Sequence, residues 1–147
     1  MSPRDFMTLA QVLQTGNSEA EWRTAISRAY YSAFHTARQL LRDWGFQLAR
    51  TDQAHVGLTR RLTVTGVAEY EKVARELSEL RAKRNVADYD LDRECRRELA
   101  AQSVKTTGVL LGLLAVEVSS QRQQQVIQAV RDFERNVLRE VTWQSLN

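Results

Sequence analysis

The 147-residue sequence is poor in residues that interrupt or cross-link a chain. Its only proline is Pro3, so nothing after it imposes a proline break on a helix or a central strand. The only cysteine, Cys95, excludes a disulfide framework and offers no paired ligands for zinc. With two histidines and no dense carboxylate cluster, the sequence predicts neither a metal site nor a cofactor.

Long apolar runs are also missing. A membrane span needs about 18 consecutive apolar residues, whereas the longest apolar stretch, 108–118, already contains Glu117. The first ten residues, MSPRDFMTLA, carry early charges and no apolar run, which is unlike a secretory signal. Glycine-rich phosphate loops, HExxH and Gly-x-Ser-x-Gly are absent from the sequence. We therefore expect a cytoplasmic protein that makes no use of a membrane.

Charge and composition leave the choice of partner open. The chain has 21 basic and 18 acidic residues, a formal net charge of +3 and a pI of about 9.3. This excess permits a nucleic-acid partner without demanding one, because strong binders concentrate their basic residues in a stripe or block. With 43% apolar and 27% charged residues, the chain has the composition of a globular protein with one core.

Helix signals divide the chain from its first residues. Ser2, with Pro3 and an acid at residue 5, predicts a helix that runs to a left-handed stop at Gly16. A second capping box at Ser18 begins a long helix that ends at Gly45. No segment alternates apolar and polar residues over the length of a strand. The sequence therefore predicts an all-α protein, a compact antiparallel bundle of about five to six helices.

The long helix has two distinct faces when residues are placed at 100° intervals. Its apolar face holds Trp22, Ala25, Ile26, Ala29, Tyr30, Ala33, Phe34, Ala37, Leu40, Leu41 and Trp44. Its opposite face holds Thr24, Arg28, Tyr31, His35, Arg38 and Arg42. We expect the first face to be core, and the second to be either a solvated surface or one wall of a groove.

The later elements follow from weaker signals. We expect a short helix capped by Thr51 or Asp52 and ending near Leu62, and then a fourth helix after Gly66. The inner side of that fourth helix carries Val67, Tyr70, Val73, Ala74, Leu77, Leu80 and Ala87. Asp90 and Asp92 are predicted N-caps of a fifth helix, which would carry Cys95 on its apolar side. Gly108 and Gly112 predict close helix approach on this helix, since glycine otherwise costs about 1 kcal/mol in a helix interior.

The sequence divides into a bundle over residues 1–118 and a C-terminal amphipathic helix over residues 119–147. Ser119 or Ser120 is the predicted N-cap of that last helix. Its apolar seam is narrow and consists of Val126, Val130, Phe133, Val137 and Val141. The seam either packs on the same bundle or forms part of an interface with another subunit.

Two local motifs carry a resemblance to a known family. The first motif, Arg-x-Tyr-Tyr-x-x-Phe, runs from Arg28 to Phe34; the second, Arg-Asn-x-Ala-Asp-Tyr, runs from Arg84 to Tyr89, with His55 between them. In this order they resemble the HEPN family of small helical bundles, especially its stand-alone bacterial and archaeal branch. The resemblance spans roughly residues 17–118. It implies a helical bundle, an RNA-related role and frequent homodimers whose groove forms across the dimer.

Many HEPN proteins are metal-independent ribonucleases or the toxin halves of toxin–antitoxin pairs. Their active motif is an arginine followed by a polar residue and then by a histidine, with four to six residues between the arginine and the histidine. Arg84 and Asn85 match it, but the histidine position falls on Tyr89, Asp90 or Leu91. Tyrosine, with a pKa of about 10, and aspartate, at about 3.9, are poorly matched to proton transfer near neutral pH. We therefore expect weak or absent ribonuclease activity.

The resemblance makes Arg84 and Asn85 the catalytic candidates. The candidates for binding RNA or phosphate are Arg28, Tyr31, His35, Arg81, Asp88 and Tyr89. Structural interpretations stand beside these roles: Arg84 and Asp88 are spaced for a local ion pair, and Tyr89 is expected to pack with its ring buried. His35 is also a candidate source of the missing imidazole. We interpret His55 and Cys95 as structural.

Three functions remain open from the sequence. The first is an RNA-associated module of a toxin–antitoxin or defence system, with an antitoxin protein as a partner. The second is a non-catalytic partner of a small nucleotidyltransferase, because the HEPN family is often paired with such enzymes. These enzymes can modify a tyrosine near the active motif, and Tyr89 is the nearest tyrosine here. The third is a structural or nucleotide-binding bundle. For each of them we expect a homodimer.

Overall fold

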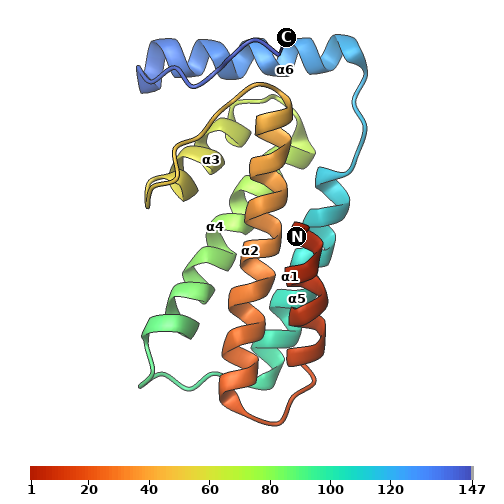
Figure 1. Cartoon of the computed structure of the whole chain (residues 1–147), viewed down its shortest axis with the longest axis vertical. Coiled ribbons are helices and arrows are strands. Elements are labelled where there is room, and N and C mark those ends of the chain that lie inside the picture. The colour runs from red at the N-terminus through yellow and green to blue at the C-terminus, as the bar shows by residue number, and fades with distance from the viewer. Residues whose placement is uncertain (147) are drawn as a thin grey trace. The chain divides into compact units, whose positions relative to one another are not determined.

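The computed structural model describes residues 1–146, and within this range it contains helices and loops but no strand (Figure 1). The α-helices are α1 (Pro3–Leu13), α2 (Glu19–Asp43), α3 (Ala54–Thr63), α4 (Ala68–Tyr89), α5 (Arg97–Leu114) and α6 (Ser120–Phe133), and a π-helical turn, η1 (Glu134–Leu138), follows α6. The predicted all-α, helical-bundle class is confirmed. Asn147, the last residue of the predicted C-terminal segment, lies outside the described residues.

The chain forms two compact units, each assembled from two separate stretches of sequence. The first unit contains Met1–Thr36 and Glu76–Gly112, and the second contains Ala37–Arg75 and the chain from Leu113 onward. Both α2 and α4 therefore contribute one part to each unit. None of the helices in residues 1–146 has the length and apolar character that a membrane crossing requires.

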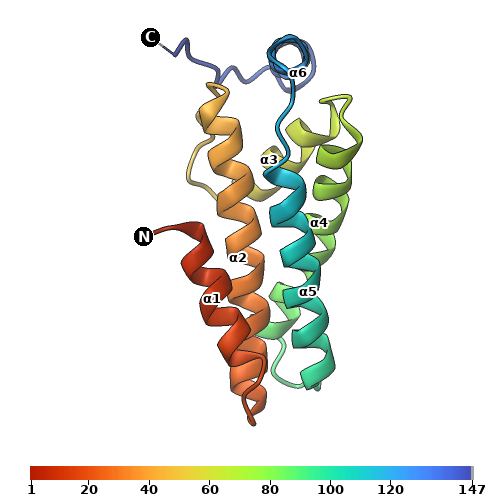
Figure 2. The same ribbon diagram turned by 90° about the vertical axis from the view of Figure 1, so that its right-hand side faces the viewer.

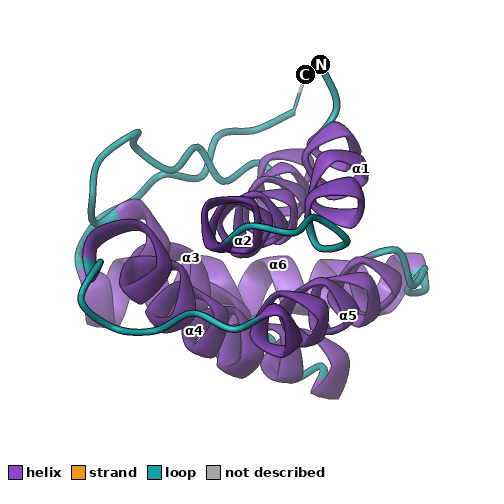
Figure 3. Cartoon of the chain, turned by 90° about the horizontal axis from the view of Figure 1, so that it is seen from below, coloured by secondary structure: helices purple, strands orange, loops and turns teal. Residues whose placement is uncertain are grey.

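The first unit is a bundle of four helical segments. In Figures 2 and 3, α1 and the first part of α2 lie beside each other, with α5 and the last part of α4 alongside. Two of its core clusters consist mainly of alanine, which allows the helices to approach closely there. Their helical members are Ala10 from α1, Ala25, Ile26 and Ala29 from α2, Ala87 from α4, and Ala100 and Val104 from α5.

Both predicted capping boxes are confirmed. The Ser2 hydroxyl accepts a hydrogen bond from the Arg4 amide, and the Asp5 carboxylate accepts one from the Ser2 amide. The Ser18 hydroxyl likewise accepts from the Glu21 amide at 3.2 Å, and the Glu21 carboxylate accepts from the Ser18 amide at 2.9 Å. The predicted left-handed stop at Gly16 is wrong: α1 ends at Leu13, and Gly16 does not have a positive φ.

The long helix α2 matches its predicted pattern closely. The residues of its predicted apolar face are buried, with two exceptions. Trp22 and Leu40 are half-buried. Gly45 ends the helix as predicted, with φ of 104°, a conformation that a side chain would strain. On the opposite face Arg28, Tyr31 and His35 are half-buried, whereas Thr24 and Arg42 are exposed.

Three predictions about the fifth helix are wrong. It begins at Arg97, so Asp90 and Asp92 do not cap it, and Cys95 lies in the loop before it. Cys95 is nevertheless a core residue, and burial raises the pKa of its thiol. Gly108 and Gly112 are exposed and do not bring helices together: a Cβ at Gly108 would meet only Met7, at 3.7 Å, and one at Gly112 would meet nothing within 4 Å.

Local sequence signals misplaced the N-cap of α3 but predicted the buried side of α4 correctly. The N-cap of α3 is Gln53, which makes no side-chain cap hydrogen bond, so the predicted caps at Thr51 or Asp52 are wrong. Gly66 adopts a φ of 72° before α4. The predicted inner side of α4 is buried throughout, at Val67, Tyr70, Val73, Ala74, Leu77, Leu80 and Ala87.

The C-terminal helix begins as predicted and ends earlier. The Ser119 hydroxyl accepts a hydrogen bond from the Arg122 amide and caps α6, and Val126 and Val130 are buried. The seam then stops, because Arg139 adopts a left-handed conformation with φ of 53°. Val137, within η1, and Val141, after Arg139, are both exposed, so their predicted place on one apolar seam is wrong.

A buried ion pair explains why the chain turns back after η1. Arg61 donates from Nε and Nη2 to Oε2 of Glu134, at 2.9 and 2.8 Å, and the two side chains are 2% and 1% exposed. Oε1 of Glu134 also accepts from the amides of Thr142 and Trp143, at 3.0 and 3.2 Å. The carboxylate thus binds α3 and the C-terminal segment together. Sequence analysis missed this pair.

Candidate functional site

Arg23 fixes the C-terminal end of α4, where the second motif lies. Its guanidinium donates hydrogen bonds to the carbonyl oxygens of Val86, Ala87, Asp90 and Arg93, and to the carboxylate of Glu19. The last carbonyls of a helix have no partner within the helix, and this end favours positive charge. Arg23 provides both the hydrogen-bond donors and the positive charge, and its side chain is only 9% exposed. Sequence analysis assigned Arg23 no role.

Glu19 holds Arg23 in this position. The carboxylate accepts from Arg23 Nε at 2.9 Å and from the Cys95 amide at 3.1 Å. The hydrogen bond from Arg23, followed by that from Cys95, lowers the pKa of Glu19. One carboxylate therefore connects α2 to both the end of α4 and the loop that follows it.

The register set by Arg23 places one stripe of α2 against the second motif. Residues 23, 27 and 31 are four apart and so lie on one side of α2. The Ser27 hydroxyl donates to Oδ2 of Asp88 at 3.1 Å. The Tyr31 hydroxyl accepts from Nη2 of Arg84 at 2.6 Å. The two motifs, more than fifty residues apart in sequence, are thus joined by hydrogen bonds.

Arg84 is held in place by three side chains. It donates from Nε to Asp88 at 3.1 Å, from Nη1 to Asn85 at 2.7 Å and from Nη2 to Tyr31. The predicted Arg84–Asp88 ion pair is therefore present, and it is partly buried, with side chains 12% and 28% exposed. These bonds use three of the five N–H groups of the guanidinium. Its carbon also lies 5.1 Å from the ring centroid of Tyr31 and 5.6 Å from that of Tyr89.

Arg28 and a row of rings extend this site along α2. The Arg28 guanidinium donates to the Ser27 hydroxyl at 3.1 Å and lies 5.1 Å from the centroids of both Phe6 and Tyr31. His35 stacks on Tyr31 and on Phe6, each at 5.9 Å between centroids. Phe6 comes from α1 and was missed, because its amphipathic pattern gives no sign that it meets a polar group.

Arg81 lies one turn before Arg84 on α4. Its Nε is buried and has no hydrogen-bond partner among the residues described. Burial raises the pKa of the nearby Tyr30 hydroxyl, while the charges of Arg81 and Arg84 act in the opposite direction. We call Ser27, Arg28, Tyr31, Arg81, Arg84, Asn85 and Asp88 the arginine cluster. Its formal charges are three positive and one negative.

Two sequence-predicted residues lie differently from expectation. Tyr89 is 75% exposed at the end of α4, so the interpretation that its ring is buried is wrong. One side of that ring faces Arg84. His55 is half-buried in α3, in the second unit, and is not part of the arginine cluster.

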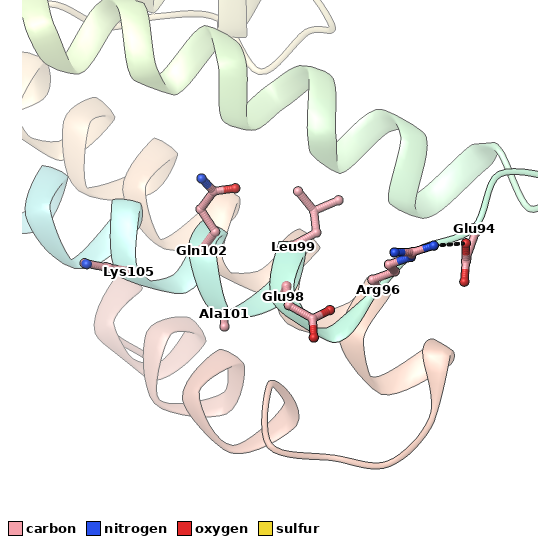
Figure 4. A pocket seen from close by; sticks show the side chains of 7 residues that line it. All are labelled: Glu94, Arg96, Glu98, Leu99, Ala101, Gln102 and Lys105. Carbon is pink, nitrogen blue, oxygen red and sulfur yellow. Dashed lines mark hydrogen bonds and ion pairs between the residues drawn. The ribbon is translucent and has the colours of Figure 1, made fainter.

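A surface hollow of about 660 Å³ lies beside the start of α5 (Figure 4). Its lining residues are Glu94, Arg96, Glu98, Leu99, Ala101, Gln102 and Lys105. They point in different directions: in Figure 4, Leu99 and Gln102 extend to one side of the helix and Glu98 to the other. Glu94 and Arg96 form an exposed ion pair with each other. None of the sequence-predicted site residues lines this hollow, and no group of functional side chains converges there.

Within residues 1–146, no group of three histidine, cysteine, aspartate or glutamate side chains is placed to hold a metal ion. Comparison with known proteins found no matching family model, no similar curated protein and no similar solved structure. The arginine cluster is therefore interpreted from its own chemistry, together with the motifs of the sequence.

Proposed function

We propose that this protein is a HEPN-like, RNA-associated module of a toxin–antitoxin or defence system. In this proposal the arginine cluster holds the RNA backbone, with Arg84 and Asn85 at its centre. The observation that carries the proposal is the 2.6 Å hydrogen bond from Arg84 to Tyr31, because it unites the two family-like motifs in one site.

The chemistry of the cluster supports RNA as the ligand. Guanidinium groups bind phosphate oxygens through charge-assisted hydrogen bonds, and aromatic side chains stack on unpaired bases. The cluster places Arg28 and Arg84 around the ring of Tyr31, and Tyr89 adds an exposed ring beside Arg84. With Asp88 as its one carboxylate, the cluster keeps an excess of positive charge for an anionic ligand.

We propose that any RNA cleavage is weak and independent of metal. In this reaction the RNA 2′-oxygen would attack the adjacent phosphorus and form a 2′,3′-cyclic phosphate, while the bond from phosphorus to the 5′-oxygen of the next nucleotide breaks. The 2′-hydroxyl would lose its proton to water, the departing 5′-oxygen would take one from water, and Arg84 would stabilise the charged transition state. The positions where the family motif has its proton-transferring histidine hold Tyr89, Asp90 and Leu91 instead. The imidazole of His35 stacks on the rings of Tyr31 and Phe6. Rapid EDTA-resistant cleavage that is lost in Arg84→Ala would contradict the proposed weakness.

Arg84→Ala is expected to weaken binding of single-stranded RNA by about tenfold or more, because a good arginine–phosphate contact is worth roughly 1.5–3 kcal/mol. Fluorescence anisotropy with a labelled oligonucleotide at fixed low salt measures the effect. Arg75→Ala is the matched control, since it removes the same charge from an exposed position of the same helix. Equal losses in the two variants, or no RNA binding by the wild type, would refute the proposed function.

The exposure of Tyr89 favours a second candidate, a non-catalytic partner of a small nucleotidyltransferase. The side chain lies at the end of α4, and Leu91, also 75% exposed, follows it in the loop. Co-expression with a nucleotidyltransferase encoded beside the gene is then expected to add an AMP-sized mass to Tyr89. The increment should vanish in Tyr89→Phe, and its absence from the wild type counts against this candidate. The homodimer and the antitoxin partner stay predictions from the sequence.

A further inference from the structure

We propose that Ser27, Arg28 and Arg84 form a phosphate subsite that the free protein fills with its own Asp88 carboxylate. This inference rests on the proposed function and adds a regulatory element to the same site. A backbone phosphate of RNA then binds by displacing Asp88 from Arg84, so the carboxylate acts as an internal competitor of the ligand.

The contacts of Asp88 are those of a bound oxyanion. Its Oδ2 accepts from the Ser27 hydroxyl on α2 and from Arg84 Nε on α4, each at 3.1 Å. Arg28 donates in turn to the Ser27 hydroxyl at 3.1 Å. Hydroxyl and guanidinium groups are common donors to phosphate oxygens in protein–nucleic acid contacts. A phosphate oxygen at the position of Oδ2 would meet the same two donors.

Arg84 does not depend on Asp88 for its position. Its two terminal nitrogens donate to Asn85 and Tyr31, at 2.7 and 2.6 Å, and neither of these hydrogen bonds involves Asp88. The aspartate side chain is also the more exposed partner, 28% against 12% for the arginine. An anion that arrives from solvent therefore meets the carboxylate first and finds the guanidinium already oriented behind it.

Asp88→Asn tests this inference because it removes the charge and keeps the size of the side chain. Asp92→Asn is the matched control: it changes the net charge equally, in the exposed loop after α4. We expect Asp88→Asn to bind single-stranded oligouridine about three- to tenfold more tightly than Asp92→Asn does. If a further phosphate is engaged, the slope of log K against log salt steepens by about 0.7.

Each outcome decides between the two claims. Weaker RNA binding by Asp88→Asn would show that the carboxylate positions Arg84, and it would overturn the inference. A gain in affinity equal to that of Asp92→Asn would show an effect of net charge alone, and it would also overturn the inference. If wild-type binding depends on Arg84 but Asp88→Asn gains nothing, only the inference fails. If neither the wild type nor Asp88→Asn binds RNA, the proposed function and the inference both fail.

Two further measurements keep the result unambiguous. Thermal unfolding of each variant confirms that it is folded, and Asp88→Ser provides a second substitution if Asp88→Asn is not. A polyglutamate peptide carries negative charge without phosphate and represents an acidic protein partner. An equal gain in its affinity would overturn the assignment of the subsite to phosphate.

Discussion

Replacing Glu134 with alanine is expected to lower the free energy of unfolding by about 3–5 kcal/mol, because it leaves a buried charge without its partner. That charge is Arg61, whose side chain is 2% exposed. The substitution also removes the acceptor of the Thr142 and Trp143 amides, so the C-terminal segment loses its anchor. Urea denaturation followed by circular dichroism measures the loss.

The large loss of stability expected for Glu134→Ala depends on the burial of the ion pair, and two control variants test this dependence. Glu79→Ala removes an exposed glutamate from α4 and is expected to change stability by less than about 0.5 kcal/mol. Replacing both charges, as in Arg61→Met with Glu134→Leu, is expected to recover much of the loss, since an apolar pair fills the space without an unpaired charge. A cost for Glu134→Ala as small as that of Glu79→Ala would contradict the buried pair.

Arg23→Ala is the second substitution with a large expected effect, a loss of about 2–4 kcal/mol in unfolding free energy. It removes the donors to two carbonyl oxygens in the last turn of α4 and to two in the loop that follows, and it leaves Glu19 without its cation. Because these bonds set the register between α2 and α4, the variant is also expected to bind RNA more weakly, although Arg23 is not part of the arginine cluster.

Arg23→Lys separates the two roles of this side chain. Lysine keeps the positive charge at the helix end but lacks the planar fork that reaches several carbonyls. We therefore expect Arg23→Lys to recover only a minor part of the stability, with Arg75→Ala as the control for charge alone. Full recovery by lysine would show that the charge, rather than the hydrogen-bond geometry, stabilises the end of α4.

The parts of the fold that follow from local chemistry were predicted well. The capping serines at residues 2, 18 and 119 act within three residues of themselves, and the apolar face of α2 follows from helical spacing alone. Gly45 likewise has the positive φ that its position after the helix requires. These signals depend on neighbours in sequence, so a single sequence contains them.

The errors occur where distant contacts override local signals. Asp90 was a plausible cap, yet its carbonyl oxygen accepts from Arg23, 67 residues away, and α5 starts later. The sequence predicts one apolar seam along the last helix, but α6 ends at Phe133, and the buried carboxylate of Glu134 binds the returning chain after η1. The contact of Arg23 with the Asp90 carbonyl and the pair of Arg61 with Glu134 cannot be identified from sequence spacing, because the two partners in each case lie on different elements.

The candidate site was predicted in its members but not in its connections. The motif resemblance named Arg84, Asn85 and Tyr31. It did not single out Ser27, whose hydroxyl connects Arg28 to Asp88, or Phe6 from α1. These residues complete the site through tertiary contacts, and serine and phenylalanine are too common in helices to stand out in a sequence.

The most direct test of the arginine cluster is an NMR titration of the arginine Nε–H resonances with single-stranded RNA. Our account predicts that Arg84 and Arg28 shift first and in parallel with binding, since both lie in the proposed subsite. Arg61, buried against Glu134, should not shift. Saturable RNA binding that moves other arginines while Arg84 and Arg28 stay unchanged would contradict the account.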